Sequence, residues 1–374
     1  MTTKFCVHSH TGISIVNSGG SVRPCCKFDD IDILPTIFEI DTLDQIHRQS
    51  PFDDLKSNLN QGNFPKGCAT CSNSEANGLE SRRQFTGTMY GNYNLFNPNY
   101  IQDLEISLDY TCNMMCRMCN PGASSKWGSA STVIEQFADS KIELDDVTNY
   151  KDYQTQFKHV FENTDLSHAR HVKLEGGEPF YAKNFEWMLD KLDREVIDKN
   201  KLFLNITTNG SVFPNENILS KLSKFNTTIS FSIDAYGDLA NCLRWGVEWD
   251  QIETNIRKFI KTDFNILTNI TVSILNFNKL NQLIEFCDSI ALRTSFNELH
   301  DPRYLSMYQL DKQYRMNYLS GVPKLDRLIS ADIKIEPEFK KLRRSIEILD
   351  DYQGLRFADV NEEIWSLINA DFRQ

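Results

Sequence analysis

The sequence predicts an α/β fold in which parallel strands alternate with helices. The main observation is a series of short β-rich segments between residues 100 and 300, each followed by a segment with helical character. Such alternation is typical of βα units, which build a parallel sheet or a barrel. A second observation is that eight of the ten cysteines lie before residue 120, which predicts a separate cysteine-rich segment at the N-terminus.

The chain is expected to divide into three segments. These are a cysteine-rich module over residues 1–95, the strand–helix domain over 96–305 and a helical, charge-rich extension over 306–374. In the module, β-rich residues from Cys6 onward and from Ser21 onward flank Gly19 and Gly20, which predicts a β-hairpin. A helix is expected over residues 42–59.

Within the central domain the elements alternate in a regular order. Strands are expected at 104–108, 172–174, 202–206, 228–233 and 270–274, with a last strand near 296–300. Helices are expected at 184–192, 215–224, 250–261 and 279–289, and residues 139–163 form an inserted, mostly helical segment.

Composition excludes several classes of protein. With 40 basic and 51 acidic residues the net charge is −11, which argues against a protein that binds large nucleic acids, because phosphate contacts need clustered Lys and Arg. Residues 1–10 have no apolar core, so they do not form a signal peptide, and no apolar run approaches the ~20 residues of a membrane helix. We therefore expect a cytoplasmic protein whose thiols stay reduced and available for metal.

The sharpest motif is a cysteine loop directly after the first expected strand of the central domain. Cys112, Cys116 and Cys119 follow the spacing C-x3-C-x2-C. Three thiolates can bind three irons of a [4Fe–4S] cluster and leave the fourth iron for a non-protein ligand. A structural zinc site is the alternative, but it needs a fourth Cys or His, and this loop contains no histidine.

This loop resembles the signature of the radical SAM superfamily, and further motifs extend the resemblance over about residues 100–300. They are EGGEP at 175–179, TTNG at 207–210, SFSID at 230–234 and CLRWG at 242–246. The resemblance implies a partial (β/α)6 TIM-like barrel. It also implies an enzyme that reductively cleaves S-adenosylmethionine (SAM) to a 5′-deoxyadenosyl radical, which removes a hydrogen atom from a substrate.

The resemblance also assigns SAM-binding roles. Gly176, Gly177 and Glu178 would accept hydrogen bonds from the SAM amino group, and Arg244 would pair with its carboxylate. Four polar residues at strand ends would hold the ribose or the methionyl part: Thr208, Asn209, Ser232 and Asp234. Simple turn, cap or surface roles remain open for these positions.

A second metal site is predicted in the module. Four cysteines, Cys6, Cys25, Cys68 and Cys71, could close an auxiliary [4Fe–4S] cluster, with Cys26 as the alternate to Cys25. The pattern is similar to twitch and SPASM modules, although the better-known modules follow the barrel and this one precedes it. An all-thiolate zinc site is the alternative.

The resemblance favours a peptide or protein substrate, with a small molecule or nucleoside as the alternative. An electron donor of the flavodoxin or ferredoxin type is implied as a partner. A rival of another class is a non-catalytic, zinc-stabilised binding protein. Cys242 and Cys287 have no assigned role, and a hydrogen-atom donor would need one of them to face the cavity.

Overall fold

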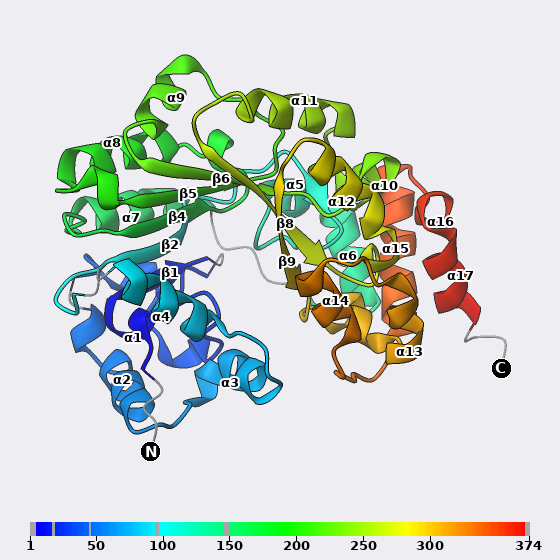
Figure 1. Cartoon of the computed structure of the whole chain (residues 1–374), viewed down its shortest axis with the longest axis horizontal. Helices are drawn as coiled ribbons and strands as arrows, with labels where there is room; N and C mark the ends of the chain where they lie inside the picture. Colours follow the sequence, from blue (N-terminus) through cyan, green and yellow to red (C-terminus); the bar gives the residue numbers. More distant parts are fainter. Residues whose placement is uncertain (1–4, 17–18, 45, 94–96, 145–149, 371–374) are drawn as a thin grey trace. The chain divides into compact units, whose positions relative to one another are not determined.

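The computed structural model describes residues 5–16, 19–44, 46–93, 97–144 and 150–370 (Figure 1). A seven-stranded sheet has the order β1-β2-β4-β5-β6-β8-β9, and a two-stranded sheet pairs β3 with β7. The pairs β1–β2, β2–β4, β4–β5 and β8–β9 are parallel. Helices follow most of these strands, which confirms the expected α/β class and partial barrel.

The predicted strands of the central domain are present with small shifts of their ends. In the large sheet they are β2 (Asp103–Ser107), β4 (His171–Glu175), β5 (Phe203–Thr208), β6 (Asn226–Ser232), β8 (Asn265–Val272) and β9 (Arg293–Glu298), and β1 (Gly12–Ile15) of the module joins them. The short strands are β3 (Met115–Cys116) and β7 (Arg244–Trp245). Seven strands instead of about six result from β1, which the module adds beside β2.

The predicted hairpin in the module is wrong in its first arm. Cys6 precedes a short helix, α1 (Val7–Thr11), and β1 pairs in parallel with β2, in register Gly12↔Asp103. In the described residues one antiparallel bridge joins the two arms, in which the backbone N–H groups of Ser14 and Arg23 donate to each other's carbonyls over 2.8 and 2.9 Å, while Ser21 forms a bridge with Thr36 instead. The partner of β1 lies about ninety residues away in sequence, beyond the reach of a local pattern.

The chain forms two compact units, and the three sequence segments stay a prediction. The first unit contains residues 1–111, 146–206 and 214–228, and the second contains 112–145, 207–213 and 229–374. Helices of the first unit are α1, α2 (Phe52–Asn60), α3 (Ala69–Ala76), α4 (Arg82–Tyr93), α7 (Tyr150–Glu162), α8 (Phe185–Glu195) and α9 (Glu216–Leu222).

The second unit holds the remaining helices. They are α5 (Ser125–Gly128), α6 (Ser131–Asp139), α10 (Gly237–Leu243), α11 (Trp249–Phe259), α12 (Leu280–Ser289), α13 (Lys312–Arg315), α14 (Pro323–Ser330), α15 (Phe339–Gln353), α16 (Phe357–Val360) and α17 (Glu362–Ala370). The helical C-terminal segment is thus present. None of the described helices is both long and apolar enough to span a bilayer.

Strand β2 is buried on both faces, but one face carries apolar side chains and the other carries polar ones. Leu104 and Ile106 point to one face, and Asp103, Glu105 and Ser107 point to the other, all at most 3% exposed. Buried carboxylates need partners, because an unpaired buried charge is costly. The polar face of β2 therefore predicts a network of cations and hydrogen-bond donors around it.

Candidate functional site

The cysteine loop, residues 112–119, is held by an antiparallel pairing inside the second unit. Strands β3 and β7 place Cys116 opposite Arg244 and Met115 opposite Trp245. Gly246 follows with φ +126°, and a Cβ there would lie 2.5 Å from the carbonyl oxygen of Asn113. Only glycine permits this close backbone approach. The CLRWG motif is thus a structural partner of the cysteine loop.

Buried side chains fix the backbone of the loop. The Arg117 side chain is 1% exposed, and it donates to the carbonyl oxygen of Cys242 over 2.9 Å and pairs with Asp350 of α15 at 2.5 Å. Trp127 donates from Nε1 to the carbonyl oxygen of Cys116 over 2.8 Å, and Ser124 donates to that of Met114 over 2.8 Å. The loop conformation is therefore determined by its surroundings.

Hydrogen-bond donors surround the loop thiols. The N–H of Met114 lies 3.4 Å from Sγ of Cys112, and Nη1 of Arg244 lies 3.8 Å from Sγ of Cys116. Cys116 donates a hydrogen bond to Cys119, which lowers the pKa of Cys119 and raises that of Cys116. The lowered pKa of Cys119 favours its thiolate, the form that binds metal.

Two predicted SAM-binding residues, Arg244 and Asp234, bind each other. Nε and Nη2 of Arg244 donate to the same oxygen of Asp234 over 2.7 and 2.6 Å. The other oxygen of Asp234 accepts the backbone N–H of Thr271 over 2.7 Å. The side chain of Asp234 is fully buried. Because Asp234 binds Nε and Nη2 of Arg244, the remaining nitrogen, Nη1, is directed toward Cys116.

The predicted strand-end residues after β5 and β6 differ in their surroundings. Asn209 donates to Oδ1 of Asn113 over 2.9 Å and lies 3.9 Å from Sγ of Cys112, so it contacts the cysteine loop. Thr208 accepts the N–H of Gly210 over 3.1 Å and thereby closes the turn after β5. Ser232 ends β6 and is partly exposed.

The EGGEP motif continues the pairing of β4 with the segment before the loop, inside the first unit. The N–H groups of Gly177 and Glu178 donate to the carbonyls of Asp109 and Thr111 over 3.1 and 2.7 Å. Gly176 has φ +109°, and a Cβ there would lie 2.3 Å from the Asp109 oxygen. The glycines are therefore required for packing against this backbone.

Glu178 is 1% exposed, and its carboxylate accepts the N–H of Phe180 over 3.2 Å. This contact caps the turn at Pro179–Tyr181.

Asp109 is a site residue that the sequence reasoning missed. Its carboxylate accepts hydrogen bonds from the backbone N–H groups of Thr111 and Lys183, over 2.8 and 3.1 Å, and from Gln154 over 3.0 Å. Within the first unit, one buried side chain thus joins the segment that ends at Thr111, the segment after EGGEP and α7. Its position three residues before Cys112 is the only sequence signal for it.

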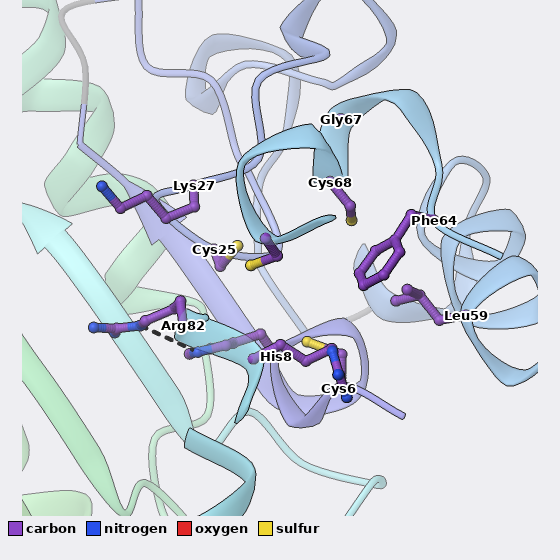
Figure 2. A pocket seen from close by; sticks show the side chains of 11 residues that line it. Cys6, His8, Cys25, Lys27, Leu59, Phe64, Gly67, Cys68 and Arg82 are labelled. Carbon is purple, nitrogen blue, oxygen red and sulfur yellow. Dashed lines mark hydrogen bonds between the residues drawn. The ribbon is translucent and has the colours of Figure 1, made fainter. Parts of the chain in front are cut away.

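The four module cysteines predicted as ligands line one cavity of the first unit. Figure 2 shows Cys6, Cys25 and Cys68 around it, and Cys71 completes the set. Leu59 and Phe64 form an apolar wall, and Arg82 and Arg83 also line the cavity. We call this cavity the thiol pocket. In the described part of the chain, no three Cys, His, Asp or Glu side chains converge tightly enough to hold a single metal ion.

An arginine clamp joins the parts of the thiol pocket. Arg83 makes two hydrogen bonds to Glu75, over 2.9 and 2.8 Å, and donates to the carbonyl oxygen of Phe5 over 2.9 Å. Glu75 lies one turn after Cys71 on α3, and Phe5 precedes Cys6. Ser81 donates to Glu75 over 2.7 Å. Glu75, Ser81 and Arg83 therefore bring two of the cysteine-bearing segments together.

Cys25 and Cys26 point to different surroundings. Cys25 lines the thiol pocket, whereas the thiol of Cys26 donates a hydrogen bond to Glu105 of β2. Burial raises the pKa of Cys6 to about 11 and that of Cys68 to about 12, so these thiols are protonated without metal. Metal binding would release these protons.

The two unassigned cysteines are buried in helices. Cys242 is 2% exposed on α10 and Cys287 is fully buried on α12, and burial raises the pKa of both thiols. The second unit contains a cavity of about 400 Å³. Its walls include Cys119 together with acidic and basic side chains: Glu143, Asp301, Arg303, Glu338 and Lys341. Neither Cys242 nor Cys287 lines this cavity.

Comparison with protein families gives one match. Residues 106–287 match the family described as the Radical SAM superfamily. The matched segment begins in β2 and ends in α12, and it contains the cysteine loop and the four accompanying motifs. No curated protein matches the chain.

Several solved structures are distantly similar. "Native anSMEcpe with bound AdoMet" is 16% identical, with a TM-score of 0.41, over 64% of this chain and 64% of that one. "Streptococcus suis SuiB bound to precursor peptide SuiA" is 17% identical, with a TM-score of 0.36, over 72% and 49%. "TYW1 with a lysine-pyruvate adduct bound" is 14% identical, with a TM-score of 0.30, over 66% and 71%. The chain thus covers less than two thirds of the first two.

Proposed function

We propose that this chain, whose residues 106–287 match the Radical SAM superfamily, reductively cleaves SAM and removes a hydrogen atom from a peptide or protein. Cys112, Cys116 and Cys119 would hold a [4Fe–4S] cluster that supplies the electron for cleavage to a 5′-deoxyadenosyl radical. The observation that carries the proposal is the set of three thiols in one loop, with donors aimed at the sulfurs of Cys112 and Cys116.

The chain's own residues would bind and orient SAM. Arg244, held by Asp234, keeps Nη1 as a donor for an anionic group, which suits the SAM carboxylate. Glu178 and the backbone of Gly176 and Gly177 are proposed for the amino group. For Asp234 we propose a positioning role, because both of its oxygens already accept hydrogen bonds.

The decisive test is 5′-deoxyadenosine formation from SAM with dithionite under anaerobic conditions. Replacing Cys112, Cys116 and Cys119 together by Ala should abolish the product. Replacing the buried Cys287 by Ala is the matched control and should leave product formation within about twofold of the wild type. Undiminished product from the triple variant would overturn the proposal.

We also propose an auxiliary [4Fe–4S] cluster bound by Cys6, Cys25, Cys68 and Cys71. The fit rests on the donor set: four thiols line one cavity together with two arginines, which suit the negative charge of a thiolate-bound cluster. In a cluster each thiolate has its own iron, so the four sulfurs need not meet at one ion. Iron and sulfide analysis should give about eight irons per chain. Zinc without acid-labile sulfide would support the rival zinc-binding protein.

A peptide or protein is the proposed substrate class, with a small molecule or nucleoside as the alternative. The cavity beside Cys119 supports a polar substrate, because charged side chains of both signs line it. An electron donor of the flavodoxin or ferredoxin type is proposed as the partner. The test is mass spectrometry of candidate peptides after turnover with SAM: a modified residue supports the peptide class. Reaction of nucleosides alone would support the alternative.

A further inference from the structure

A buried array of charges joins the thiol pocket to the polar face of β2. Arg82, which lines the pocket, lies 3.4 Å from Glu105 through its Nη2. Lys173 of β4 donates to Glu105 over 2.8 Å and to Glu175 over 2.6 Å. The side chains of Glu105, Lys173 and Arg82 are 4%, 22% and 25% exposed, so water screens these charges little.

A hydrogen bond to His8 orients the Arg82 side chain at the pocket end of the array. Nε of Arg82 donates to Nε2 of His8 over 3.3 Å, so Nε2 is the unprotonated nitrogen (Figure 2). The charged side chains of the array are those of Arg82, Glu105 and Lys173, and Lys27 and Arg83 also line the pocket.

We propose that Glu105 and Arg82 are positioning residues that set the reduction potential of the auxiliary cluster. The inference rests on the cluster proposed above. Reduction adds one negative charge to the cluster, so a nearby cation stabilises the reduced form and a nearby carboxylate destabilises it. Arg82 lines the cavity itself, while Glu105 on the sheet partly compensates its charge.

Two charge-removing variants should shift the potential in opposite directions. Glu105→Gln removes a negative charge and leaves Arg82 uncompensated, while Lys173 keeps Glu175 as its partner, so the potential should rise. Arg82→Gln removes a cation that lines the cavity, so the potential should fall. We expect each variant to change the ratio of reduced to oxidised cluster about tenfold at a fixed applied potential, which is about 59 mV for one electron.

The experiment is an EPR-monitored redox titration of the full chain with Cys112, Cys116 and Cys119 replaced by Ala, so that only the auxiliary cluster contributes. Glu195→Gln is the matched control. It removes the same charge from the same unit, but Glu195 pairs with Lys191 on α8. The control should leave the ratio within about twofold of its parent.

Opposite shifts of the two variants support the proposal, because a merely structural role would not reverse sign. Shifts no larger than that of the control would overturn it, and so would loss of the cluster from both variants, which would assign the array to folding alone. A parent protein without any iron–sulfur signal would overturn the auxiliary cluster itself. That failure is recognised in the parent before any variant is compared.

Discussion

The cysteine loop and the thiol pocket bring thiols together in opposite ways. In the loop, three cysteines lie within eight consecutive residues, and the surrounding unit fixes one backbone segment. In the pocket, four cysteines come from three separate segments, which the Arg83 clamp and an apolar wall assemble. A site made from one segment depends on backbone fit. A site made from several segments depends on side-chain contacts between them.

The largest expected effect tests backbone fit. In Gly176→Ala the new Cβ would lie 2.3 Å from the Asp109 oxygen at φ +109°, so we expect a loss of about 3 kcal/mol or more in the free energy of unfolding. Gly78→Ala is the control in the module, because its φ is +69° but its Cβ would meet nothing within 4 Å. It should cost about 1 kcal/mol.

Urea unfolding of both variants checks this prediction, and 5′-deoxyadenosine formation should fall only in Gly176→Ala. Equal losses of stability in the two variants would show that backbone strain, rather than the close approach to Asp109, is what matters.

The next effect concerns the pair Cys25 and Cys26. We expect Cys25→Ser to lower the iron content from about eight to about four per chain, because it removes a pocket thiol. Cys26→Ser should keep about eight irons, since its side chain contacts Glu105. Iron analysis after anaerobic reconstitution measures both. The reverse result would make Cys26 the ligand.

A smaller effect should follow from loss of the clamp. Arg83→Met leaves the Glu75 carboxylate, whose side chain is 10% exposed, without its bidentate partner, which costs about 3 kcal/mol. The auxiliary cluster should then be lost to a chelator several times faster, while the loop cluster is unaffected. Arg257→Met is the control, because its pair with Glu253 is half exposed and contributes less than about 0.5 kcal/mol. Equal cluster loss from both variants contradicts the clamp.

The smallest expected effect concerns how the stability of the module responds to acid. Burial lowers the pKa of His47 to about 3 in the folded module. In the unfolded chain the same imidazole binds a proton below about pH 6.5. Stability from this residue is complete above pH 6.5 and is lost progressively as the pH falls toward 3. We compare the free energy of unfolding of His47→Phe with that of the wild type. The gain of the variant should be roughly 1–2 kcal/mol larger at pH 5 than at pH 7. An equal gain at both pH values would contradict this prediction.

The strand–helix order and the cysteine loop were predictable because both are local. The strands carry their own β-rich runs, and the loop spacing lies within one segment. The hairpin was wrong because Gly12–Ile15 pairs with a strand about ninety residues later. No local pattern encodes that choice of partner.

The finer contacts of the site could not be predicted for the same physical reason. Arg244 and Asp234 each look like independent ligand-binding residues in the sequence, yet they form a buried pair. Asp109 escaped notice because a carboxylate that accepts hydrogen bonds from two distant segments has no spacing of its own. Likewise, Glu105 reads as one residue of a strand until Arg82, Cys26 and Lys173 surround it.

Strand β1 has a consequence for handling the protein in the laboratory. It covers the edge of β2 with four residues, all fully or nearly buried, that come from the cysteine-rich module. An expression clone that starts after the module would leave the backbone edge of β2 unpaired, which is a template for aggregation. The cysteine-rich module and the sheet should thus be expressed as a single piece, and an insoluble short clone would say nothing about the intrinsic solubility of the barrel.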